Sequence, residues 1–153
     1  MKARLAASAA LALGIALGGS GCSMITYQAT TEKYDPSDGV SADIGALDLR
    51  NILVVSEDGE EGNLIMSVTN TGDDDATLEV QLVDGGETFE IDVDAGATVS
   101  LGTEEEEPLL LEGIDTQPGG LVPMFFQYSG AEGQEVQVPV LDGRLPEYED
   151  LVP

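Results

Sequence analysis

Carboxylates predominate among the ionisable side chains that could carry out chemistry in this 153-residue chain. It contains thirty Asp and Glu residues, a single cysteine (Cys22), four methionines and no histidine. A Ser or Cys nucleophile needs a basic partner, and the lack of histidine removes the commonest one. Carboxylate pairs can transfer protons, but no spacing distinguishes one pair among so many. We therefore expect a protein that is not an enzyme.

Two groups of acidic residues are candidate ligands for a hard cation, because Ca²⁺ and Mg²⁺ prefer carboxylate oxygens. The candidates are Asp73, Asp74 and Asp75, which follow a predicted turn, and Glu90, Asp92 and Asp94, on the polar side of a predicted strand. Neither group has the spacing of an EF-hand loop. A solvated acidic surface without a cofactor is the default expectation for both.

The segment that positions the only cysteine is the N-terminus. Lys2 and Arg4 precede an uncharged run over residues 5–17, and small residues lead from there to Cys22. This is the layout of a secretory signal peptide, and the run is too short to cross a hydrocarbon core of about 30 Å. We expect residues 1–21 to be a cleaved lipoprotein signal peptide.

Cys22 at the end of such a segment resembles the lipobox cysteine of bacterial lipoproteins, although Gly19 stands where that family usually has an aliphatic residue. The resemblance implies that the Cys22 sulfur is acylated and that Cys22 becomes the mature N-terminus. The alternatives for a lone cysteine are a free thiol, an intermolecular disulfide and a buried small side chain. The position favours acylation, which predicts a protein anchored by lipid on the extracytoplasmic face of the cell membrane.

The charge of the mature chain limits its partners. Removing residues 1–21 leaves Lys33, Arg50 and Arg144 against thirty acidic residues, a net charge of −27. Three cations cannot build a phosphate-binding surface, so nucleic acid is excluded as a partner. Anionic headgroups are also repelled, and membrane contact is expected only through Cys22. The acidic excess favours an adaptation of the whole surface over a dedicated binding site.

Apolar and polar residues then alternate in short runs, which predicts strands. Residues 22–43 lack any such period and contain Asp35-Pro36 and Asp38-Gly39, which indicates a flexible spacer. Over residues 44–141 the runs recur about every ten residues with turn signals between them. The pattern predicts an all-β domain, an antiparallel immunoglobulin-like or cupredoxin-like β-sandwich of seven to eight strands. Its interior is expected to hold Leu78, Val80, Leu82, Phe89, Ile91, Val93, Met124, Phe126, Val136 and Val138.

Three features depart from simple alternation. Residues 52–55 are apolar on both faces of their predicted strand. Pro139 interrupts the last strand pattern and indicates an edge strand or the end of a strand, because proline cannot donate a hydrogen bond to a neighbouring strand. Residues 142–153 are acidic and contain two prolines, and we expect a poorly ordered tail.

Two stretches resemble known families. The sequence ADIGALDLRN over residues 42–51, after a signal ending in Cys22, resembles the start of actinobacterial lipoproteins of the LpqE type. The sequence LLLEGIDTQPGGLVPMFFQYSGAEGQEVQVPV over residues 109–140, with DAGATV over 94–99 before it, resembles the C-terminal half of the PCuAC class of periplasmic copper chaperones. The second resemblance implies a cupredoxin-like sandwich, the fold that the periodicity predicts independently.

The copper ligands of that class do not transfer with the fold. The resemblance implies a His-x-Met pair just before the segment matching residues 111–114, where this chain has Pro108 and Leu110. Outside the predicted signal peptide, Met24 falls in the spacer, while Met66 and Met124 fall on core-facing positions of strands. Cu(I) needs thioether, imidazole or thiolate donors gathered at one place, so we expect no tight Cu(I) site.

Phe125 and Tyr128 are the candidate partner-binding residues. They flank a strand whose other face is apolar, and they either form an exposed patch or complete the core. The sequence therefore predicts a non-catalytic binding or accessory module of the cell envelope with a protein partner. The alternative is a metal-ion carrier that uses carboxylate ligands. Acidic side chains that converge in one pocket would favour the carrier, whereas dispersed acids and an uncharged patch would favour the module.

Overall fold

The computed structural model describes residues 2–19, 34–83, 85–128 and 131–153, which belong to two compact units, Met1–Tyr34 and Asp35–Pro153. The first unit contains helix α1 (Lys2–Gly19), whose Ala- and Leu-rich sequence has high helix propensity. Among the described residues, no helix has the length and apolar character needed to cross a membrane. Cys22 and Met24, and with them most of the predicted spacer, lie outside the described residues.

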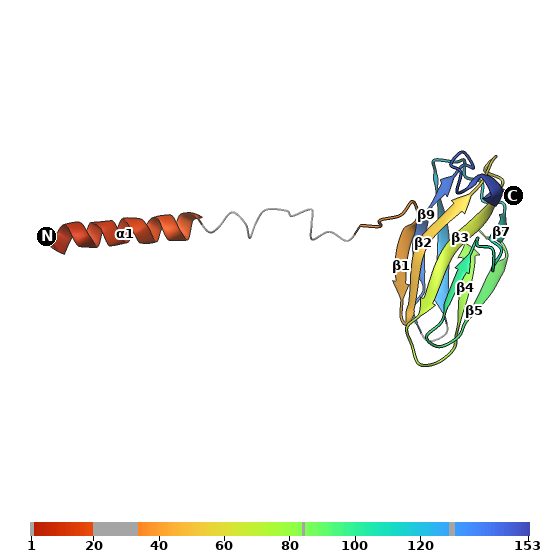
Figure 1. The fold of residues 1–153 in the computed structure, drawn as a ribbon, viewed down its shortest axis with the longest axis horizontal. Helices are drawn as coiled ribbons and strands as arrows, with labels where there is room; N and C mark the ends of the chain where they lie inside the picture. Colours follow the sequence, from red (N-terminus) through yellow and green to blue (C-terminus); the bar gives the residue numbers. More distant parts are fainter. Residues whose placement is uncertain (1, 20–33, 84, 129–130) are drawn as a thin grey trace. The chain divides into compact units, whose positions relative to one another are not determined.

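The second unit is a β-sandwich of nine strands (Figure 1). The strands are β1 (Val40–Ile44), β2 (Leu47–Val55), β3 (Glu61–Asn70), β4 (Ala76–Leu82), β5 (Thr88–Val93), β6 (Thr98–Leu101), β7 (Leu109–Glu112), β8 (Leu121–Tyr128) and β9 (Gln134–Leu141). They are hydrogen-bonded in the order β5-β4-β8-β9-β2-β3-β6, with β1 paired to β2 and β7 paired to β3. The β5-β4-β8-β9 layer and the layer of β1, β2, β3, β6 and β7 meet where β9 pairs with both β8 and β2.

The predicted sandwich is confirmed, but two details of its topology differ from expectation. The structure has nine strands instead of seven to eight, because β1 begins at Val40, within the residues expected to be spacer. The sandwich is also not purely antiparallel, since β2 and β9 run parallel at Val54↔Val140 and Val55↔Leu141. A parallel contact between strands so distant in sequence leaves no local signal in either strand.

Pro139 was predicted to mark an edge strand or the end of a strand, and it lies two residues before the end of β9. β9 lies inside the sheet, with β8 on one side and β2 on the other. Pro139 lies opposite Leu121 of β8, and the pairing with β2 begins one residue later, at Val140. The missing N–H of Pro139 therefore does not interrupt the ladder to β2.

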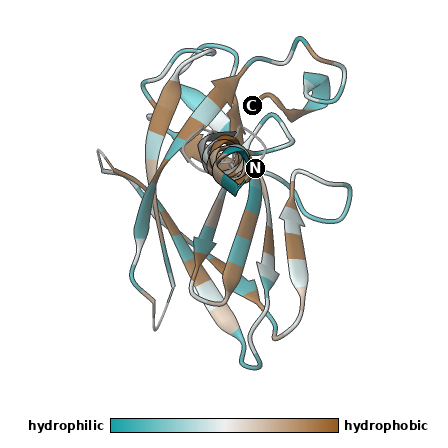
Figure 2. Ribbon diagram, turned by 90° about the vertical axis from the view of Figure 1, so that its left-hand side faces the viewer, coloured by the Kyte–Doolittle hydropathy of each residue, from teal (hydrophilic) through white to brown (hydrophobic). Residues whose placement is uncertain are grey.

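Alternating apolar side chains from both layers fill the interior of the sandwich. Figure 2 shows hydrophobic and hydrophilic residues alternating along the strands. Of the ten residues expected in this core, nine are buried, and Phe89 packs against them with part of its surface exposed. The phases of β4, β5, β8 and β9 were therefore predicted correctly from alternation, which is a local property of the sequence.

A bulge in β2 explains why its second half is apolar on both faces. Asn51 adopts φ 52°, and the register with β3 shifts between Arg50 and Leu53. One extra residue turns the following side chains to the opposite faces. Ile52 and Val54 consequently join Leu49 in the main core. The backbone N–H of Gly39 donates to the Asn51 Oδ1 (3.0 Å), which holds the bulge against the start of β1.

The C-terminal tail covers the outer side of this bulged region, and the prediction that residues 142–153 are poorly ordered was wrong. Leu53, Val55 and Ile65 form a second buried cluster with Tyr148, and Leu151 and Val152 pack against it. The tail includes a short 3₁₀ helix, Glu149–Leu151. Asn63 Nδ2 donates to the backbone oxygen of Leu151 (3.0 Å). The tail is ordered because the outward apolar residues of β2 and β3 need a cover.

Candidate functional site

The six acidic candidates do not converge on one point. Asp73, Asp74 and Asp75 lie between β3 and β4, Glu90 and Asp92 lie on β5, and Asp94 follows β5; all six are exposed. Within the described ranges, no three Cys, Asp or Glu side chains lie close enough together to hold a metal ion. The carboxylates that the structure describes in this domain are spread over its surface.

Two of these carboxylates serve local backbone and hydroxyl partners. Asp75 Oδ1 accepts a hydrogen bond from the backbone N–H of Ala95 (2.9 Å), which ties the turn before β4 to the turn after β5. Asp92 Oδ1 accepts from the Thr77 hydroxyl across the β4–β5 pair (2.6 Å). Both contacts stabilise the hairpin, which is a structural role that hydrogen-bonding residues often have in sheets.

The methionines of the domain are parts of the core. Met66 on β3 is 1% exposed and Met124 on β8 is fully buried. Met124 lies opposite Leu82, and both belong to the main core. Their sulfur atoms are enclosed by the interior of the sandwich, which explains why sequence phase placed both methionines there.

Leu110, one of the two positions at which the PCuAC resemblance implies a ligand, lies on β7 and is 44% exposed. It borders a hollow of about 310 Å³ between β7 and the β4–β5 hairpin, lined also by Leu82, Phe89 and Leu111. Two carboxylates, Glu87 and Glu112, complete the lining. The hollow contains no histidine, cysteine or methionine, so its chemistry does not fit Cu(I).

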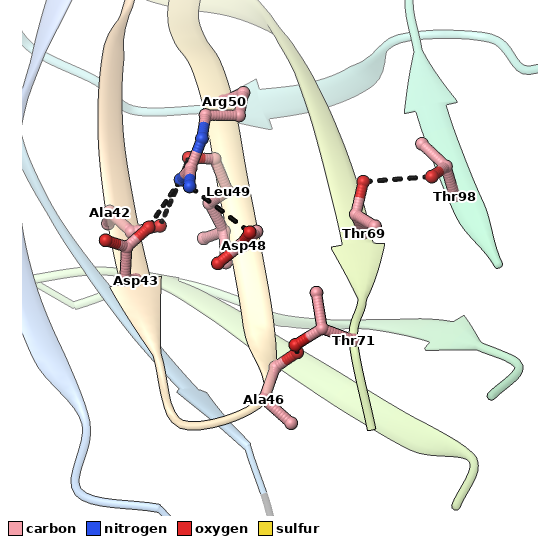
Figure 3. A network of polar contacts seen from close by, with 9 residues as sticks. All are labelled: Ala42, Asp43, Ala46, Asp48, Leu49, Arg50, Thr69, Thr71 and Thr98. Atoms are coloured by element: carbon pink, nitrogen blue, oxygen red, sulfur yellow. Dashed lines mark hydrogen bonds and ion pairs between the residues drawn. The ribbon is translucent and has the colours of Figure 1, made fainter. Parts of the chain in front are cut away.

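The basic residues of the domain that the structure describes are both bound to neighbouring carboxylates. Arg50 Nη1 lies 2.6 Å from Asp43 Oδ1 and Nη2 lies 3.3 Å from Asp48 Oδ2, and all three side chains gather on β1 and β2 (Figure 3). Arg144 Nε lies 3.2 Å from Asp142 Oδ2 in the tail. These pairs are exposed and contribute at most about 1 kcal/mol each to stability.

The structure separates the two candidate partner-binding residues. Tyr128 has the same strand phase as Phe126 and packs against the main core. The Tyr128 hydroxyl is 3.4 Å from the backbone N–H of Ala46, which donates to it, and the ring lies against Gly45. Phe125 points to the opposite face of β8. Of the two alternatives for this pair, Tyr128 completes the core and Phe125 lies on the outside.

Phe125 belongs to a set of apolar residues on the outer face of the β5-β4-β8-β9 layer. Along β8, Leu121, Pro123 and Phe125 point outward while the residues between them are buried. Pro139 of β9 lies opposite Leu121. Val83, just after β4, donates its N–H to the Pro123 oxygen (3.1 Å). We call these five residues, Val83, Leu121, Pro123, Phe125 and Pro139, the outer apolar stripe.

The sequence contains a signal for this stripe, which the prediction of Phe125 and Tyr128 as a pair did not use. The outward phase of β8 reads Leu121, Pro123, Phe125, and an antiparallel strand with one solvated face usually alternates with polar residues there. Leu121 is 56% exposed and Val83 is 44% exposed. Tyr128 was grouped with Phe125 because of residue type, whereas strand phase separates them.

Comparison with known proteins identifies the fold. No protein-family model matches the chain, and no curated protein matches it. Among solved structures, the chain is similar to the apo PCuAC domain from PmoF1 (12% identity, TM-score 0.55), covering 66% of this chain and 98% of that domain. It is also similar to the apo PmoF2 PCuAC domain (12% identity, TM-score 0.54; 69% and 98% covered) and to the copper-bound PCuAC domain from PmoF2 (12% identity, TM-score 0.51; 67% and 98% covered).

These likenesses show that the domain has a PCuAC-like, cupredoxin-like fold, as the residue patterns predicted. An identity of 12% shows a common fold alone. Function belongs to particular sites on a fold, so it must be argued from the side chains of this chain.

Proposed function

We propose that this chain is a non-catalytic binding or accessory module of the cell envelope, built on a PCuAC-like scaffold. The observation that carries the proposal is that a scaffold shared with copper-binding domains here has its domain methionines in the core and its described carboxylates dispersed. A soft metal needs thioether, thiolate or imidazole donors at one accessible place. The accessible features of the described domain are instead an acidic surface and the outer apolar stripe, which suit contact with another macromolecule.

The carboxylate-based carrier finds less support than the module. A specific Ca²⁺ site needs six to eight oxygen ligands around one point. The described carboxylates do not gather in this way. Asp75 and Asp92 also have partners within the hairpin. Dispersed acids together with an uncharged patch are the combination that favours an interaction module.

The proposal includes a lipid anchor at Cys22. The signal-like residues 1–21 and the LpqE-like start of the domain support an exported lipoprotein. Each buried acyl methylene contributes about 0.8 kcal/mol, so two or three chains on one cysteine hold the protein on the membrane. The net charge of −27 keeps the folded domain away from anionic headgroups. The membrane is then reached through the acyl chains alone.

Fractionation of cells that express wild type or Cys22→Ala protein tests the anchor. Wild type is expected in the membrane fraction and released only by detergent, whereas Cys22→Ala is expected in the soluble extracytoplasmic fraction. Mass spectrometry of the wild-type N-terminal peptide should show an acylated Cys22. Processed wild-type protein that carries a free thiol in the culture fluid would contradict the anchor.

A Cu(I) competition titration tests the absence of a copper function. Purified Cys22→Ala protein is titrated against a chromophoric Cu(I) chelator, with a copper-binding PCuAC domain as the positive control. We expect the chelator to keep its copper in the presence of this protein. Stoichiometric withdrawal of Cu(I) would show a soft-ligand site and would replace the accessory module with a copper carrier.

A further inference from the structure

The outer apolar stripe lies on the solvent-facing side of the β5-β4-β8-β9 layer. Val122, Met124 and Phe126 fill the inward phase of β8 and account for its share of the core. The outward phase adds nothing to that core, since among the described residues none of the stripe belongs to either buried cluster or packs against one. The apolar character of this face therefore has no explanation in the folding of the domain.

Backbone pairing extends the stripe from β8 to Pro139 of β9 and to Val83, just after β4. On β9, Pro139 lies opposite Leu121, and on β4 the residue opposite Phe125 is Gln81. Val83 extends β4 beside Pro123, to whose oxygen it donates. The Phe125 ring lies against Gly133, where an added Cβ would collide with it. This close neighbour restricts the Phe125 ring, and a side chain that is already restricted loses less entropy when a partner covers it.

The other layer shows how this chain treats outward apolar residues that it covers itself. Leu53, Val55 and Ile65 also point away from the main core, and the C-terminal tail buries them with Tyr148. No described segment covers Leu121 or Val83 in this way. The uncovered stripe is therefore left available for a surface that the chain does not supply.

Acidic residues border the stripe. Glu135 lies directly opposite Phe125 on β9 and is exposed. Glu79 of β4 and Glu90 of β5 lie opposite each other beyond Gln81 on the same outer face, and both are exposed. The described arginines of the domain are paired with Asp43, Asp48 and Asp142. These three glutamates therefore form an acidic rim at the Phe125 end of the stripe.

This charge distribution selects among possible occupants. A second copy of the chain would bring a second net charge of −27 and a second acidic rim against the first, which is unfavourable. Anionic lipid headgroups are repelled for the same reason. A protein surface with an apolar centre and Lys or Arg around it gains both apolar burial and favourable pairing at the rim.

We propose that the outer apolar stripe, bordered by Glu79, Glu90 and Glu135, is the docking surface for an envelope protein that presents an apolar patch surrounded by Lys and Arg. This inference rests on the proposed function and names the surface and the partner class through which the module acts. Apolar contact supplies the affinity, and the rim carboxylates accelerate association and select a basic partner.

Site-specific photocrosslinking in intact membranes tests the surface. Phe125 is replaced by a benzoyl-phenylalanine in the full-length lipoprotein, and a matched control carries the same group at Thr98. Thr98 is exposed on the outer face of the other layer, where its hydroxyl bonds that of Thr69 (2.9 Å; Figure 3). We expect an adduct from position 125 and not from position 98, and the crosslinked peptide of the partner should contain Lys or Arg beside apolar residues.

Second-site variants then separate the two contributions. Leu121→Ser should lower the yield of the adduct roughly tenfold, because it removes an exposed apolar contact beside the probe. Glu135→Lys should lower the yield at low salt and weaken its dependence on ionic strength. Both positions are on the outer face, so thermal unfolding of each variant should match that of the parent protein.

The outcomes distinguish this inference from the proposed function. Adducts only to lipid, only to a second copy of the chain, or equally from positions 98 and 125 would overturn the docking surface. A partner captured from position 98 alone would overturn the stripe and leave the accessory module standing. No protein adduct from either position, together with no partner in chemical crosslinking of the same membranes, would overturn both.

Discussion

Replacing Tyr148 by Phe removes one hydroxyl from the contact between the tail and the sandwich. Tyr148 is 8% exposed and packs with Leu53, Val55 and Ile65. Its hydroxyl donates to Asp38 Oδ2 (2.9 Å), at the start of the domain. Phe keeps the ring and the apolar packing, so the substitution isolates the hydrogen bond. At neutral pH we expect Tyr148→Phe to lower the free energy of unfolding by about 1 kcal/mol.

The same contact makes stability depend on alkaline pH. Burial, then the hydrogen bond to Asp38 and the nearby charges of Asp38 and Glu147, raise the pKa of Tyr148 from 10.0 to about 12. The folded state therefore holds the phenolic proton more tightly than the unfolded state does. The resulting stability is fully present below pH 10 and is lost as the pH rises towards about 12. The pKa difference corresponds to at most about 2–3 kcal/mol.

Denaturant unfolding at a series of pH values measures this effect. Purified Cys22→Ala protein serves as the parent, with Tyr148→Phe and Tyr34→Phe made in that background. Between pH 10 and 12 the parent should lose about 2 kcal/mol more than Tyr148→Phe. Tyr34 is exposed and distant in sequence from the cluster, so Tyr34→Phe should follow the parent. Equal pH dependence of the parent and Tyr148→Phe would show that the tail does not hold this hydroxyl in a buried contact.

Three further substitutions examine the fold. Asn51→Val should lower the melting temperature and reduce the free energy of unfolding by about 2 kcal/mol. A β-branched residue is strained at φ 52°, and valine has no acceptor for the Gly39 N–H. The control Asn51→Asp keeps an acceptor, and it should reduce the free energy of unfolding by less than half as much. Gly45→Ala should lower the free energy of unfolding, measured with denaturant, by about 2 kcal/mol or more. Gly45 has φ 59°, and a Cβ there would lie 2.7 Å from the Tyr128 ring. An unchanged denaturant midpoint would show that this turn is not packed as described. Glu90→Lys should raise the free energy of unfolding by about 0.2–1 kcal/mol at low salt, because it faces Glu79 across the β4–β5 pair, and a gain that persists at high salt would not be electrostatic.

Strand phase was the part of the fold that the sequence predicted best. Val80, Phe126 and Val138 come from three different strands, and each lies in the core as its alternation indicated. The period of a strand is two whatever it pairs with, so inward and outward positions follow from neighbours along the chain. The same reasoning would have separated Phe125 from Tyr128, which lie three positions apart and hence on opposite faces.

The bulge and the ordered tail could not be obtained from alternation. Asn51 breaks the period by one residue, and this moves Leu53 and Val55 to the outer face, although the run itself only showed two apolar faces. A run that is apolar on both faces needs another segment to bury its outer face. Nothing in the sequence of residues 142–153 shows that they pack there. Tyr148 reaches that target only after β2, β3 and the tail have been brought together across a long stretch of chain.

The amino-acid sequence by itself determined the charge, the absence of histidine, the phases of the strands and the signal-like start that ends at Cys22. Only the tertiary structure decided that the carboxylate candidates stay apart, that Tyr128 joins the core, and that one outward apolar face is covered while the outer apolar stripe is not. Composition and period are properties of neighbouring residues. Whether an apolar face is covered, and whether carboxylates converge, depends on which distant segments fold against each other. These long-range contacts therefore determine the site.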